Sequence, residues 1–175
     1  MFVRTKNIKG SKYAYLVKNK WHKRKSRPIQ KVQKYLGKVY SLTTKNNTIF
    51  QDYIPMTIDS YVKNSTPQKI FTDLISFELK KHNFIEQDNS NLIYQNLVVN
   101  TKNFKVYDFK TKHNICLELN QGFLSSYSLP NLINFKFIKG DEFEFGNLLG
   151  NTLLSTGMLI DKNLFILIFQ KLYKR

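Results

Sequence analysis

The chain has 175 residues, a formal net charge of +16 and 42% hydrophobic residues, an apolar content that supports a folded core and excludes wholesale disorder. A single cysteine, Cys116, excludes an internal disulfide and a cysteine-rich zinc site. The sequence contains no run of about 20 apolar residues and does not open on an apolar signal region, so we expect a cytoplasmic protein without a membrane partner.

The positive charge is concentrated near the N-terminus. Residues 1–45 hold fourteen basic residues, and no acidic residue precedes Asp52. The rest of the chain contains the other fourteen basic residues and all twelve acidic residues. An AT-rich genome would explain the many lysines but not their placement. Because a dense block of like charge repels itself unless an anion neutralises it, we expect nucleic acid as the partner.

The first fifty-five residues show strand patterns. Residues 2–5, 12–18 and 29–36 predict a three-stranded antiparallel meander, with a turn at residues 9–11 and with Gly37 ending the third strand. Residues 19–28 predict a basic loop around Trp21. Residues 48–54 are consistent with a fourth strand, and residues 56–66 show no clear periodicity and predict a connector.

The clearest helix begins after Thr66, with Pro67 at its first position, an apolar face through Ile70 and Leu74, and an end near Asn83. Residues 92–99, 104–109 and 115–119 predict a second antiparallel meander, and residues 126–136 a short helix. Asp141 and Asp161 predict the starts of two further helices. The last, over residues 162–173, is apolar on all sides, so it is expected to be buried or to lie at a partner interface, with burial favoured.

These patterns predict an α+β fold: an N-terminal antiparallel β meander with a basic loop, then a helix, a second small antiparallel sheet and C-terminal helices. They divide the chain into a basic β-rich nucleic-acid-binding module at residues 1–55 and an α+β domain at residues 66–175.

The predicted binding residues are cations spaced to meet phosphates, together with Trp21 and His22. They are Arg4, Lys6, Lys9, Lys12, Lys18, Lys20, Trp21, His22, Lys23, Arg24, Lys25, Arg27, Lys31, Lys34 and Lys38. Trp21 suits base stacking and suits packing over the sheet equally well. Tyrosines 13, 15, 35 and 40 are consistent with a stacking platform, but strand spacing favours a place in the core.

Catalytic patterns are weak. His22, His82 and His113 lie far apart and lack metal-ligand spacing with a Cys, Asp or Glu. Strand neighbours around Cys116 predict a buried, inert thiol, and the glycines match no phosphate-binding loop. We therefore expect no enzyme, no metal and no cofactor.

Short motifs carry a family resemblance. Residues 2–6 (FVRTK), 9–17 (KGSKYAYLV) and 33–37 (QKYLG) resemble the N-terminal part of some insertion-sequence transposases and of small basic archaeal proteins of unknown function. Residues 118–123 (ELNQGF) resemble the C-terminal part of the archaeal group. Because the chain shows no convincing carboxylate triad, the resemblance implies nucleic-acid contact without strand transfer.

The leading hypothesis is a non-catalytic RNA-binding protein associated with the ribosome or another large RNA, in which the C-terminal helices fold independently or meet a ribosomal or other protein. One alternative is a DNA-binding module of transposase or regulator type, although the basic region contains no evident recognition helix. The other alternative is a protein-interaction adaptor that docks through its C-terminal helix.

Overall fold

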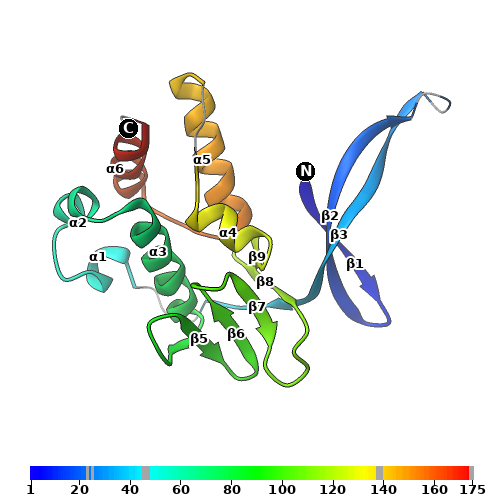
Figure 1. The fold of residues 1–175 in the computed structure, drawn as a ribbon, viewed down its shortest axis with the longest axis horizontal. Coiled ribbons are helices and arrows are strands. Elements are labelled where there is room, and N and C mark those ends of the chain that lie inside the picture. The colour runs from blue at the N-terminus through cyan, green and yellow to red at the C-terminus, as the bar shows by residue number, and fades with distance from the viewer. Residues whose placement is uncertain (23, 25, 45–47, 137–139, 174–175) are drawn as a thin grey trace.

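The computed structural model describes residues 1–22, 24, 26–44, 48–136 and 140–173. It confirms the α+β class, with an N-terminal antiparallel meander, helices, a second small antiparallel sheet and C-terminal helices (Figure 1). The elements are β1 (Phe2–Ile8), β2 (Ser11–His22), β3 (Arg27–Ser41), α1 (Phe50–Tyr53), α2 (Ile58–Asn64), α3 (Pro67–Lys81), β4 (Ile85–Glu86), β5 (Asn91–Tyr94), β6 (Leu97–Asn100), β7 (Lys105–Asp108), β8 (Ile115–Leu119), β9 (Gly122–Ser125), α4 (Ser128–Ile133), α5 (Glu142–Thr156) and α6 (Lys162–Tyr173).

The larger sheet has the strand order β1-β2-β3-β8-β9. Strand β8, predicted as part of the second meander, instead pairs in parallel with the end of β3, so that placement was wrong. The residues after β8 form the turn of the β8–β9 hairpin. This one sheet therefore joins strands from residues 1–55 to strands from residues 66–175. The smaller sheet has the order β4-β5-β6-β7, and the single run predicted at residues 92–99 is the β5–β6 hairpin.

The first three strands are longer than predicted. β2 continues to His22 and β3 begins at Arg27, so most of the predicted loop at residues 19–28 is paired strand. The β2–β3 hairpin leaves the body of the protein as a two-stranded ribbon (Figure 1). We call residues 18–22 and 26–34 of this ribbon the arm. The arm places its side chains away from the core.

Gly37 does not end β3, contrary to the prediction. It pairs with Ala14 inside the strand and has a φ of 129°. A Cβ atom at this position would lie 2.3 Å from the carbonyl oxygen of Asn114, so only glycine lets the β7–β8 loop lie this close to β3. The pairing register of β3 shifts at two places, which leaves Leu36 and Gln33 as extra residues and interrupts the alternation of side chains between the two faces of the strand.

Residues 48–64 were predicted as a strand and an irregular connector, and both predictions were wrong. Helices α1 and α2 occupy this segment, and the Thr57 side chain accepts the Ser60 N–H at the start of α2. Phe50 packs edge-on against Phe77 of α3 at 5.4 Å between ring centroids. Tertiary packing of these apolar side chains decides the local structure.

The helix starts follow the sequence closely. Thr66 accepts the Lys69 N–H with Pro67 in the first turn, and Asp141 and Asp161 accept N–H groups at the starts of α5 and α6. The predicted helix end near Asn83 is also confirmed, because α3 ends at Lys81 and Asn83 has a left-handed φ of 65°. Helix α6 buries Leu164 and Ile168 fully and leaves its other apolar residues partly or fully exposed, so it is buried on one side. Within the described residues, no helix combines the length and apolar character that crossing a membrane requires.

Candidate nucleic-acid interface

The predicted cations lie on the first three strands. All those that the structure describes are exposed except Lys12, which is half-buried. The exposed ones are Arg4, Lys6, Lys9, Lys18, Lys20, Arg24, Arg27, Lys31, Lys34 and Lys38. Lys23 and Lys25 lie outside the described residues. The N-terminal strands therefore present most of the predicted cations to solvent.

The pairing register sorts these side chains between the two faces of the ribbon, because directly opposed residues share a face and successive residues alternate. Lys18 opposes Lys31. Further towards the tip of the arm, Lys20 opposes Ile29 and His22 opposes Arg27. On the side of Lys18 nearer the body, Leu16 opposes Lys34. Lys18, Lys20, Arg27, Lys31 and Lys34 thus lie together, and we call them the basic face of the arm. Towards the body, this side of the sheet continues into the buried Ala14 and Leu16.

The other side of the ribbon carries aromatic residues. Tyr15 opposes Tyr35, Tyr13 opposes Lys38 and Trp21 opposes Pro28. The Tyr35 ring lies 5.4 Å from that of Tyr15 and 6.3 Å from that of Tyr13, measured between centroids. We call these three tyrosines the tyrosine face.

The tyrosine face is not part of the core, so the favoured prediction was wrong for these residues. Tyr35 is 53% exposed, while the core side of β2 is the opposite one. Partial burial raises the pKa of Tyr35, and its two tyrosine neighbours add to this, so the ring stays uncharged at neutral pH. Trp21 is 65% exposed and does not anchor the arm by packing over the sheet. Both aromatic groups are therefore accessible to a ligand.

Lys12 differs from the other cations. Its Nζ lies 2.6 Å from Oε1 of Glu118 on β8, and the Ser41 hydroxyl also donates to this carboxylate. Burial raises the pKa of Glu118, but the hydrogen bonds from Lys12 and Ser41 outweigh it, so the pKa is lowered. Lys12 thus ties β2 to β8 across β3, and its charge is already neutralised by the protein.

The basic face has no such partner. No Asp or Glu occurs in residues 1–51, and among the described residues of this segment Lys12 alone is ion-paired. Lys18 and Lys31 are directly opposed, an arrangement of like charges that destabilises a strand pair. An anion lying along the arm would relieve this repulsion.

A groove lies where the sheet meets the β7–β8 loop. Its walls are Tyr13, Tyr35, Lys38 and Tyr40 from β2 and β3, and Lys112 and His113 from the loop, around a volume of about 610 Å³. Residues 110–114 only connect two of the strands that the sequence predicts, residues 104–109 and 115–119. Their position beside the tyrosine face depends on the β3–β8 pairing, which no local pattern indicates.

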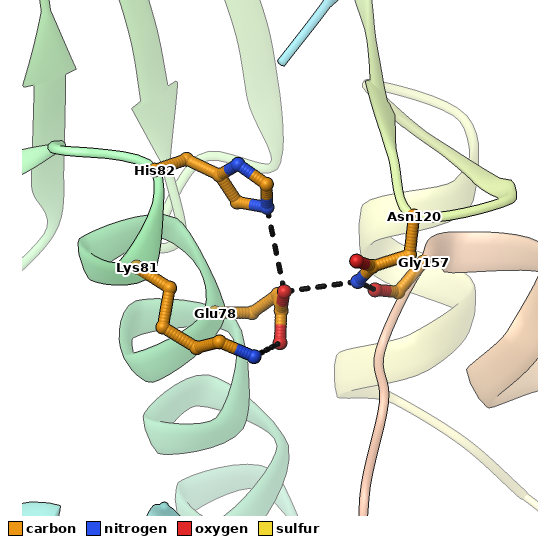
Figure 2. Close-up of polar contacts among 5 residues, drawn as sticks. All are labelled: Glu78, Lys81, His82, Asn120 and Gly157. Carbon is orange, nitrogen blue, oxygen red and sulfur yellow. Dashed lines mark hydrogen bonds and ion pairs between the residues drawn. The ribbon is translucent and has the colours of Figure 1, made fainter. Parts of the chain in front are cut away.

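A second polar cluster lies in the interior (Figure 2). Glu78 accepts a hydrogen bond from Asn120 Nδ2 at 2.9 Å, and Lys81 Nζ and His82 Nε2 lie 3.3 and 3.4 Å from its carboxylate oxygens. The same Asn120 group donates to the Gly157 carbonyl at 2.8 Å. Burial raises the pKa of Glu78, but the hydrogen bonds from His82, Asn120 and Lys81 lower it further than burial raises it.

This cluster is buried and links three parts of the fold. The side chains of Glu78 and His82 are each 1% exposed, and the contacts link α3 to the β8–β9 turn and the end of α5 (Figure 2). Cys116 is also buried, as predicted, and burial together with the Glu118 charge raises its thiol pKa to about 12. Within the described residues no three His, Cys, Asp or Glu side chains gather as metal ligands would.

Comparison of the chain with protein-family models, with curated proteins and with solved structures found no match.

Proposed function

We propose that this is a non-catalytic, cytoplasmic RNA-binding protein that associates with the ribosome or another large RNA through its N-terminal strands. The observation that carries the proposal is the basic face of the arm: five exposed cations on one side of a projecting ribbon that contains no acidic residue. Phosphate binding requires such cations, spread along a surface and left unpaired by the protein itself.

The aromatic side of the ribbon favours RNA over duplex DNA. RNA is recognised largely at loops and bulges, where unpaired bases stack on aromatic side chains. Trp21 and Tyr35 are both exposed enough for this contact. In a DNA duplex the bases are stacked on one another and are not available to these rings.

A DNA-binding module remains the second candidate, because a two-stranded β ribbon fits the major groove of B-DNA. The arm has this shape (Figure 1). Base readout there requires side chains that reach the base edges, and Asn19 and Gln30 are directly opposed on the aromatic side of the arm.

A protein partner at the C-terminal helices is compatible with either function. Phe143 and Leu154 of α5 are 77% and 60% exposed, and Ile166 of α6 is also exposed. Apolar side chains that form one contiguous exposed patch are typical of contact sites. A ribosomal or other protein bound here would leave the arm free for nucleic acid.

Competition binding distinguishes the candidates. A labelled RNA stem-loop is bound to the protein and displaced either by unlabelled stem-loop or by a DNA duplex of equal length, at several salt concentrations. We expect the RNA to compete better and the log–log salt slope to be about −3.5, from five phosphate contacts at about −0.7 each. A slope shallower than about −2 would mean that few phosphates are contacted. Equal or better competition by the duplex would favour DNA.

A further inference from the structure

Hydrogen bonds within the β7–β8 loop and close packing at Gly37 hold the groove beside the tyrosine face in shape. The main-chain N–H of Asp108 donates to the His113 carbonyl at 3.0 Å, and the Asp108 side chain accepts the Thr111 N–H at 2.8 Å. The hydrogen bond from Thr111 lowers the pKa of Asp108, so the carboxylate stays ionised and holds the loop. Gly37 has no side chain, so the β7–β8 loop can lie directly against β3. The two walls of the groove are therefore fixed before any ligand arrives.

Aromatic and cationic side chains line the groove. One wall presents the aromatic rings of Tyr13, Tyr35 and Tyr40. The described lining includes the cations Lys38 and Lys112 and no carboxylate. The groove has a volume of about 610 Å³, which falls within the roughly 300–1,000 Å³ range of small-ligand sites. A ligand that matches this groove is flat, aromatic and anionic.

We propose that the groove binds one unpaired nucleotide of the RNA, with its base stacked on Tyr35 and its phosphate beside Lys38 and Lys112. This inference rests on the proposed function and deepens it, because the basic face of the arm would bind phosphates in any RNA whereas the groove selects RNA that offers an unpaired base. Tyr35 lies on the opposite side of the ribbon from Lys31 and Lys34, so an RNA that occupies both the groove and the basic face passes over an edge of the ribbon.

The test uses the full-length protein and two labelled RNAs of equal length, one a stem with an eight-nucleotide uridine loop and the other a fully paired duplex, in fluorescence anisotropy titrations. The variants are Tyr35→Ala, Tyr35→Phe, His113→Ala and, as an exposed aromatic control on α5, Phe143→Ala. Thermal unfolding of each variant shows that it is folded.

We expect Tyr35→Ala to weaken binding of the loop RNA by about fivefold to 150-fold, the effect of removing one base-stacking ring. Tyr35→Phe keeps the ring and should stay within about twofold of the wild type. His113→Ala alters the opposite wall and should weaken loop binding by about two- to tenfold through one lost polar contact. None of the three variants should change duplex binding, and Phe143→Ala should change neither RNA.

Two other outcomes would overturn the inference in different ways. If the wild type binds loop and duplex equally and Tyr35→Ala leaves both affinities unchanged, the groove holds no nucleotide. The proposal that the arm binds RNA phosphates would be unaffected by that result. If the wild type binds neither RNA, the proposed function fails and the groove assignment fails with it.

Discussion

Neutralising the basic face of the arm should change RNA binding and protein stability in opposite directions. The variant replaces Lys18, Lys20, Lys31 and Lys34 by Gln, which keeps side chains of similar length and removes four positive charges. All four side chains are exposed, so no core contact is lost.

The magnitude follows from the number of phosphates released. Each contact to a single strand contributes about 0.7 to the log–log salt slope, so four lost contacts should reduce the slope by about 2.8. With 1 M salt as the point where this contribution vanishes, binding at 0.15 M should weaken about 200-fold. The assay is a fluorescence anisotropy titration of a labelled stem-loop RNA at four or more salt concentrations.

Stability of the free protein should rise in the same variant. Lys18 and Lys31 are directly opposed, and a like-charged pair in this position destabilises a strand pair by roughly 0.2–1 kcal/mol. Removing it should raise the melting temperature at low salt by about 0.4–4 °C, at 2–4 °C per kcal/mol for a chain of this size.

The matched control replaces four exposed lysines of the body by Gln: Lys63, Lys102, Lys136 and Lys162. It removes the same net charge, so a uniform electrostatic effect would weaken RNA binding equally in both variants. Equal loss in the two variants, or an unchanged salt slope in the arm variant, would refute the assignment of phosphates to the basic face.

Further predictions concern single positions. Gly37→Ala should force the Asn114 carbonyl away from β3 and lower the unfolding free energy by roughly 1–3 kcal/mol, measured by urea denaturation; an unchanged midpoint would show that the close approach is unnecessary. Trp21 is the sole tryptophan, so the fluorescence of its exposed indole should be quenched when RNA is added. Fluorescence that stays unchanged at saturating RNA would place the arm outside the interface. Because the pKa of Glu78 is lowered from its ordinary 4.5, its contribution to stability is complete above that value and is lost as the pH falls through the folded pKa. Glu78→Gln should therefore cost roughly 3 kcal/mol at pH 7 and much less in acid, and a loss that is equal at pH 7 and pH 3 would contradict the ionised state.

Features governed by neighbours in the sequence were predictable. The caps at Thr66, Asp141 and Asp161 depend on a side chain and an N–H three residues later, and all three form as expected. The charge of the N-terminal block was evident from the residue order alone. That five of its fourteen cations would lie on one face of a projecting ribbon could be seen only from the pairing of β2 with β3.

Features governed by distant residues were not predictable. Strand β8 has the same apolar pattern whether it joins the second sheet or pairs with β3, and only the assembled fold decides. Glycine usually ends a strand, so Gly37 was misread, because its real constraint is the carbonyl of Asn114 far along the chain. Alternation in β2 predicts two faces but does not say which one is buried. Tyr13 and Tyr15 were assigned to the wrong face for that reason, whereas Tyr40 of β3 does pack against the core.

Association with a large RNA is tested most directly by the position of the protein when a cell extract is fractionated on a sucrose gradient. We expect the protein to travel with ribosomal subunits or other large RNA and to return to the top of the gradient after ribonuclease treatment. A protein that stays at the position expected for a free 20.7 kDa chain, or that is released by deoxyribonuclease and not by ribonuclease, would contradict RNA binding.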